Sequence, residues 1–191
     1  MRRWTVLPAA LVLAATTALP AAAAGFVEPA TRCQIGWGSP AEGRSTGQAP
    51  ELRGIRSGEH PCFDRLVFEA PGSSPANPVG YHVRYTDALL QDASGHPLPV
   101  RGSAVLEVIV DAPAYDRQTM APTIPARSGQ PLPGVDLTGY RTFQDTVFGA
   151  SHEGRTQIGL GLHTRLPYRI LQLDNRLVID VAHTANGTEQ G

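Results

Sequence analysis

The sequence has 191 residues, of which 41% are hydrophobic, and this length suffices for one domain with a core of its own. All 16 basic residues are arginines, and 17 acidic residues offset them to give a net charge of −1. This balance leaves no excess of cations to neutralise phosphates, so nucleic acid is excluded as an expected partner.

The first 24 residues have the features of a cleaved signal peptide. Arginines at positions 2 and 3 precede an apolar run from Val6 to Leu19, and four alanines at positions 21–24 precede the expected cleavage site. The apolar run has only about 14 residues, whereas a membrane-spanning helix needs roughly 20. We therefore expect an exported chain, secreted or held in the cell envelope, with no membrane span after cleavage.

Two cysteines, Cys33 and Cys62, lie in the predicted mature part of the chain. An even number of cysteines in an exported protein favours a disulfide, and two thiols this far apart without further ligands make a poor metal site. In the chain-entropy model such a bridge stabilises the fold by about 3.5 kcal/mol. It would also hold the segment around Trp37 against the start of the first strong strand.

The residues after the signal segment change from irregular to strand-like. From Gly25 to Gly58 the sequence is rich in glycine, proline, serine and charge, which predicts an irregular arm, 25–51, ahead of a domain that spans 52–183. Period-two alternation then predicts a series of strands, and no run of about a dozen residues has helical spacing. The expected strands are Phe63–Glu69, Val79–Thr86, Ala104–Val110, Tyr140–Phe148, Thr156–Leu162, Tyr168–Leu173 and Arg176–Ala182. Residues 184–191 are expected to form a disordered tail.

Three local features stand out between these strands. Asp92–Gly95 has the composition of a turn, and the leucine-containing arms on either side predict a hairpin. Gly159 and Gly161 alternate with bulky residues, and such bare strand positions mark a close backbone approach or a bulge. Asp111–Val135 is a proline-rich stretch of roughly 25 residues, which predicts either a functional loop or a tolerated surface insertion.

No motif for catalysis is present. The six histidines are scattered, and none is spaced to share a metal ion with another. Gly149–Gly154 resembles a nucleophile elbow, but Glu153 stands where that motif requires glycine. Bridged cysteines carry no thiolate, and the acidic residues offer no defined catalytic pair. We therefore expect a protein that is not an enzyme and that needs neither a metal nor a cofactor.

Arginines stand beside aromatic residues in several predicted strands, which suits the binding of sugars, peptides or carboxylates. The alternative is that the aromatic residues belong to the core and the arginines are solvated neighbours. The candidate ligand-binding residues are Arg65, Tyr140, Arg141 and Arg169.

Both ends of the domain resemble a known family. Asp64–Glu69 and Leu166–Val181 are similar to the opening and closing strands of the AMIN domain, specifically the AMIN-like domain of small exported bacterial proteins. The resemblance extends from about Leu52 to His183. It implies a compact β-sandwich, and AMIN domains occur in envelope proteins, where they localise amidases or secretion pores by binding peptidoglycan.

These observations predict an all-β fold, a β-sandwich of two packed sheets with a long proline-rich insertion loop and an irregular, disulfide-tethered N-terminal arm. The expected function is that of an exported, non-catalytic module that binds a component of the cell envelope, with the glycan or peptide stem of peptidoglycan as the expected ligand. The alternative is a protein-interaction or structural module, in which a sheet edge or the proline-rich loop docks an exported partner.

Overall fold

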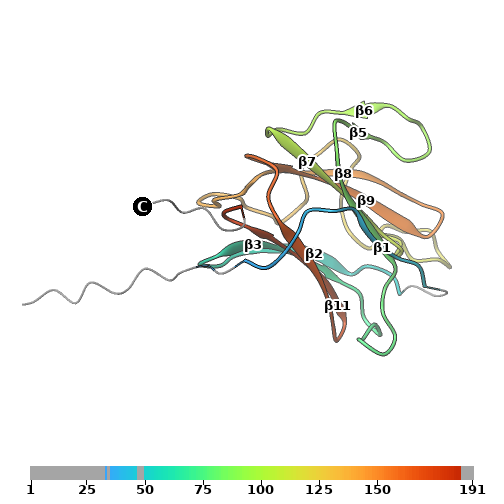
Figure 1. Cartoon of the computed structure of the whole chain (residues 1–191). Coiled ribbons are helices and arrows are strands. Elements are labelled where there is room, and N and C mark those ends of the chain that lie inside the picture. The colour runs from blue at the N-terminus through green and yellow to red at the C-terminus, as the bar shows by residue number, and fades with distance from the viewer. Residues whose placement is uncertain (1–32, 34, 47–49, 186–191) are drawn as a thin grey trace, which may run out of the picture. The chain divides into compact units, whose positions relative to one another are not determined.

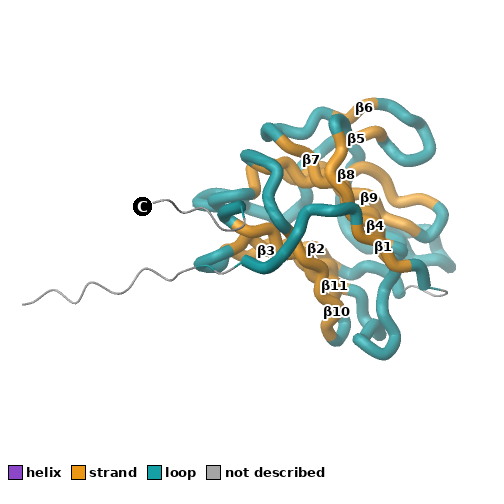
Figure 2. The backbone as a smooth tube through the Cα atoms, in the orientation of Figure 1, coloured by secondary structure: helices purple, strands orange, loops and turns teal. Residues whose placement is uncertain are grey.

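A computed structural model describes residue 33, residues 35–46 and residues 50–185. The predicted signal peptide and the last residues of the predicted tail, 186–191, lie outside the described residues. Within the described ranges the chain consists of strands and loops, as Figure 2 shows, and no helix there is long and apolar enough to cross a membrane. The prediction of an all-β fold is confirmed.

Two antiparallel sheets form the fold (Figure 1), and a short hairpin is added to them. The five-stranded sheet has the order β1 (Glu42–Arg44), β4 (Tyr81–Thr86), β7 (Ala104–Val110), β9 (Arg155–Leu162) and β8 (Phe143–His152). The four-stranded sheet has the order β10 (Tyr168–Leu173), β11 (Arg176–Ala182), β3 (Phe63–Glu69) and β2 (Gly54–Glu59). The hairpin pairs β5 (Leu89–Leu90) with β6 (Pro97–Leu98), as the turn between them predicted.

The core lies between the two sheets and is built from alternate residues of each strand. Leu66 and Phe68 of β3 and Ile179 of β11 point inward from the four-stranded sheet, and all three are fully buried. Leu106 of β7 and Leu160 of β9 belong to the same core cluster. Each such side chain stabilises the fold by about 1.5–3 kcal/mol, so the period-two pattern brings the two sheets together.

Gly159 and Gly161 of β9 leave no room for a side chain, because other parts of the chain cross directly over them. A Cβ at Gly159 would come within 2.5 Å of the Leu89 side chain, and a Cβ at Gly161 would overlap the carbonyl oxygen of Arg101. The segment that carries the β5–β6 hairpin therefore lies on the outer face of the five-stranded sheet. The close approach that the glycines predicted is confirmed.

Residues 111–142 contain no strand, and only part of them lies at the surface. Ala112, Ala114, Ile124 and Leu132 are buried members of the core cluster. The interpretation of Asp111–Val135 as a surface insertion holds for residues 117–122, which are exposed, but not for these apolar side chains, which close one part of the core.

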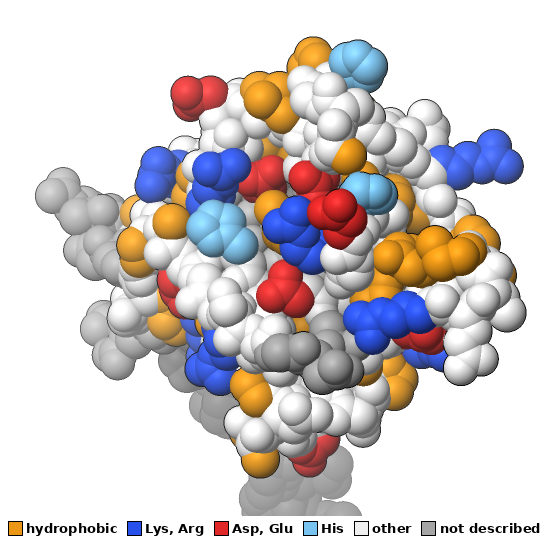
Figure 3. Space-filling model, turned by 90° about the vertical axis from the view of Figure 1, so that its right-hand side faces the viewer, with side chains coloured by type: hydrophobic (Ala, Val, Ile, Leu, Met, Phe, Trp, Pro, Cys, Tyr) orange, Lys and Arg blue, Asp and Glu red, His pale blue; other side chains and the backbone are white. Residues whose placement is uncertain are grey.

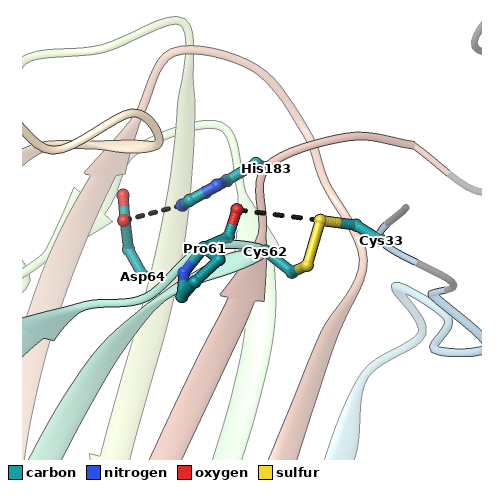
Figure 4. The surroundings of a disulfide bond; sticks show 5 residues. All are labelled: Cys33, Pro61, Cys62, Asp64 and His183. Carbon is teal, nitrogen blue, oxygen red and sulfur yellow. Dashed lines mark hydrogen bonds and ion pairs between the residues drawn. A yellow bond between two sulfur atoms is a disulfide. The ribbon is translucent and has the colours of Figure 1, made fainter. Parts of the chain in front are cut away.

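The predicted disulfide joins Cys33 to Cys62, with the two Cα atoms 5.3 Å apart. Figure 4 shows the bridge beside the turn that leads into β3. The sulfur of Cys33 lies 3.7 Å from the carbonyl oxygen of Pro61, but a bridged sulfur carries no proton to donate. The prediction of a disulfide-tethered arm is confirmed.

The arm and the residues that follow it are less irregular than the sequence predicts. The carbonyl oxygen of Gly38 accepts a hydrogen bond from the backbone of Tyr168 on edge strand β10 at 2.8 Å. Farther along, β1 pairs with β4 of the other sheet. The arm thus runs from one sheet to the other, and both β1 and β2 were missed because they are short and rich in glycine and charge.

Asp64 connects the two sheets through a fully buried carboxylate on the inward face of β3. One carboxylate oxygen accepts the backbone N–H groups of Thr142 and Phe143, at 2.6 and 3.0 Å, where β8 of the other sheet begins. The other oxygen lies 2.8 Å from Nε2 of His183, directly after β11 (Figure 4). A single polar group thereby holds three segments together inside an apolar core.

Removing the carboxylate in Asp64→Ala should lower the free energy of unfolding by about 2–3 kcal/mol, because it leaves the buried N–H groups of Thr142 and Phe143 without an acceptor. Urea denaturation of the disulfide-bonded chain measures this change. Asp87→Ala, at an exposed position, is the matched control and should change stability by less than about 0.5 kcal/mol. Equal effects of the two substitutions would show that Asp64 does not tie the sheets together.

Candidate functional site

Three charged residues from different strands form a row on the outer face of the four-stranded sheet. Asp180 of β11 pairs in register with Arg65 of β3 on one side and with Arg169 of β10 on the other. Neighbouring residues along each strand point the opposite way into the core, so alternation directs all three side chains outward. The structure therefore brings together two of the predicted ligand-binding residues, Arg65 and Arg169.

The row is held by one buried carboxylate between two guanidinium groups. Nε and Nη2 of Arg65 donate to the two oxygens of Asp180 at 2.6 and 2.9 Å, and Nε of Arg169 donates at 2.8 Å. The Asp180 side chain is fully buried, whereas those of Arg65 and Arg169 are 23% and 36% exposed. The hydrogen bond to Asp180 raises the pKa of Arg65. Two cations against one anion leave an excess positive charge on this face.

Aromatic rings cover the same row. The guanidinium of Arg169 lies 4.2 Å from the ring centre of Trp37 and 5.3 Å from that of Phe63, and the guanidinium of Arg65 lies 5.1 Å from Phe63. The Trp37 and Phe63 rings are 5.8 Å apart, and His60 stacks on Phe63 at 4.5 Å. We call the set Trp37, Phe63, Arg65, Arg169 and Asp180 the arginine–aromatic cluster.

The position of Trp37 follows from the arm. The Cys33–Cys62 bridge fixes the chain four residues before it, next to Phe63, and the hydrogen bond of Gly38 to β10 fixes the chain directly after it. Trp37 and Asp180 were not among the predicted site residues. The cysteine spacing already indicated that the Trp37 segment lies near Phe63, whereas nothing in the sequence indicates that Asp180 pairs with two arginines.

In the described part of the chain, Tyr140 and Arg141 form no hydrogen bond, ion pair or ring contact with the cluster. The hydroxyl of Tyr140 donates to Ser57 at 2.8 Å, and its ring stacks on Phe143 with the centroids 5.8 Å apart, at the margin of the core. Arg141 is exposed. Tyr140 thus has the packing role that was the alternative for the aromatic residues, and ligand binding by either residue stays a prediction.

The described residues that resembled a catalytic motif have structural partners. The hydroxyl of Ser151 accepts the N–H of Ala114 at 2.8 Å and lies 3.1 Å from the hydroxyl of Thr156. In the described ranges, no three His, Cys, Asp or Glu side chains are grouped to hold a metal ion. The chemistry available at the arginine–aromatic cluster is recognition, in which guanidinium donors and apolar ring faces are offered together.

Asp180→Asn should destabilise the fold by about 2–4 kcal/mol, because two neighbouring cations lose their shared buried counterion. Glu69→Gln is the matched control, since Glu69 pairs with Arg56 at 3.0 Å in the same sheet but both side chains are about half exposed. Its effect should stay below about 1 kcal/mol. Urea denaturation of both variants measures these changes in the free energy of unfolding. Equally small losses of stability would mean that Asp180 does not organise the cluster.

The family of this domain follows from comparison with known proteins. No curated protein and no solved structure gives a significant match to the sequence. A family model described as the AMIN-like domain matches residues 50–183. This range contains every strand of both sheets except β1, and it contains four of the five residues of the arginine–aromatic cluster, all but Trp37. The match covers more than two thirds of the sequence. The chain therefore belongs to the AMIN-like domain family.

Proposed function

We propose that this protein is an exported module that binds peptidoglycan, and that the arginine–aromatic cluster recognises the carboxylates of the peptide stems. Family membership indicates an envelope-associated, non-catalytic module. The disulfide agrees with an extracytoplasmic location, since such bridges persist in oxidising compartments. The proposal adds the ligand and the surface that contacts it.

The geometry of Arg169 is the main observation that supports the proposal. Its Nε is engaged by Asp180 and its guanidinium plane lies over Trp37, so the side chain is held in one orientation. No other hydrogen bond of this guanidinium occurs among the described residues, and the side chain is about one third exposed. Its outer N–H groups are therefore available to a carboxylate, and a guanidinium already oriented loses less entropy on binding.

The charge of the cluster selects for an anionic group. Arg65 and Arg169 share the single carboxylate of Asp180, which leaves one positive charge of the pair uncompensated. Peptide stems carry carboxylates on short, flexible side chains. The rings of Trp37 and Phe63 add apolar surface beside the charge. Anionic ligands with an apolar part are therefore favoured over nucleic acid, for which the chain as a whole has no excess of positive charge.

The alternative of partner docking through the proline-rich segment has less support. Ile124 and Leu132, which such a loop would offer to a partner, are buried in the core. Docking through a sheet edge is the other form of this alternative, and no observation on the edge strand β2 favours it.

Cosedimentation of the exported chain with purified sacculi tests the proposal. The wild-type chain should pellet, and Arg169→Ala should bind about tenfold more weakly, because it loses a charge-assisted hydrogen bond. Arg176→Ala is the matched control, since Arg176 is an exposed arginine of β11 whose side chain hydrogen-bonds only the carbonyl oxygen of Asp174 among described residues. It should pellet like the wild type.

Sacculi stripped of their peptide stems extend the same assay. If carboxylates are the recognised groups, these stripped sacculi should bind the wild-type chain no more tightly than they bind Arg169→Ala. Failure of the wild type to pellet above an unrelated control protein would refute peptidoglycan binding. Equal binding by Arg169→Ala and Arg176→Ala would instead remove the cluster as the contact surface.

A further inference from the structure

A concave site lies on the other side of the sandwich from the arginine–aromatic cluster. A pocket of about 340 Å³ opens on the outer face of the five-stranded sheet. Its floor comes from β4, β7 and β9, and its rim from residues 88–95 around the β5–β6 hairpin. The volume is within the range of small-molecule sites, which is about 300–1,000 Å³. We call it the hairpin pocket.

One buried side chain fixes the rim to the floor. The side-chain amide of Gln157 on β9 donates to the carbonyl oxygen of Leu90 and to the carboxylate of Glu107, both at 2.8 Å. Its amide oxygen accepts the backbone N–H of Asp92 at 2.9 Å. Because floor and rim share these hydrogen bonds, the pocket is formed before any ligand arrives, which lowers the entropy that binding costs.

The charged groups of the pocket already have partners. Nε of Arg84 donates to the nearly buried Glu107 carboxylate at 2.7 Å, and Arg155 lies 3.4 Å from Asp92. Figure 3, which views the molecule from the right-hand side of Figure 1, shows acidic and basic side chains intermixed on the surface that it displays. A charged ligand would lose hydration here without meeting an uncompensated opposite charge, so the pocket favours a neutral one.

The polar groups nevertheless keep capacity for further hydrogen bonds. Arg84 is 52% exposed, and only its Nε is engaged among the described residues, so its outer nitrogens can donate. The carboxylate of Asp92 is 30% exposed and can accept. Leu90, also 52% exposed, and Ile109 supply apolar wall. Donors, acceptors and an apolar wall in one small pocket match a ring that carries hydroxyl groups on its edge and C–H bonds on its face.

The rim also holds a strained residue. Ala93 lines the pocket with a φ of 73°, in the left-handed region that alanine rarely adopts. Such a conformation costs about 1 kcal/mol or more and is concentrated at functional sites, where surrounding contacts maintain it. Here the backbone N–H of Ala93 donates to the Asp92 carboxylate at 3.1 Å.

We infer that the hairpin pocket binds a neutral sugar ring. The inference does not rest on the proposed peptide-stem recognition, because the pocket and the arginine–aromatic cluster lie on the outer faces of different sheets and share no residue.

Amide chemical shifts of the full exported chain with its disulfide intact test this inference, in titrations with methyl glucoside, N-acetylglucosamine and cellobiose. At least one sugar should perturb the amides of residues 84–95 and 107–109. Arg84→Lys keeps a cation beside Glu107 but removes the planar donors, so it should weaken binding about five- to tenfold. Leu90→Ala, at a half-exposed position, should also weaken binding. Arg169→Ala, in the other sheet, should bind the sugar as the wild type does.

Three results would overturn the sugar site. The first is that none of the three sugars perturbs the pocket amides up to its solubility limit. The second is perturbation that centres on Trp37 and Phe63, and the third is wild-type affinity in both Arg84→Lys and Leu90→Ala. Thermal unfolding of each variant verifies that it is folded. Since free sugars carry no peptide stem, a negative result here leaves the comparison of Arg169→Ala with Arg176→Ala on sacculi unaffected. Equal binding of those two variants to sacculi likewise leaves the sugar site unaffected.

Discussion

The buried carboxylate of Asp64 is the constraint on which the arrangement of both sheets depends. It accepts backbone N–H groups from the start of β8 and faces His183 after β11, so it fixes β3 relative to segments that are distant in sequence. The neighbouring residue on the same strand is Arg65, which points to the opposite face. Holding Asp64 in place therefore also sets the position of the arginine that begins the surface row.

The arginine–aromatic cluster is assembled by strand register and by the disulfide together. Antiparallel pairing places Asp180 between Arg65 and Arg169, and the bridge from Cys33 to Cys62 returns the arm to the same end of the sheet. A carboxylate that is removed from water strengthens its hydrogen bonds to both guanidinium groups, because the local dielectric is low. The result is a rigid surface, whereas arginines on isolated strands would be solvated and mobile.

The two outer faces of the sandwich present different chemistry. One carries an excess positive charge beside aromatic rings, and the other carries a small pocket in which the charges are paired and the hydrogen-bonding groups are only partly used. Peptidoglycan contains both acidic peptides and neutral sugar rings. Under the two proposals the domain would contact both components of this polymer, and both faces depend on backbone that the core holds fixed.

The sequence by itself determined the strands with strong alternation, the disulfide, the AMIN-like resemblance and the two arginines that point outward, because alternation along one strand is a local property. It did not determine β1 and β2, whose short, polar segments become strands only by pairing with a neighbour. Nor did it determine that Asp180 is shared by Arg65 and Arg169, that the proline-rich segment completes the core, or that residues 88–95 form the rim of a pocket over β9. These features depend on register and on contacts between distant segments, which only the tertiary structure decides.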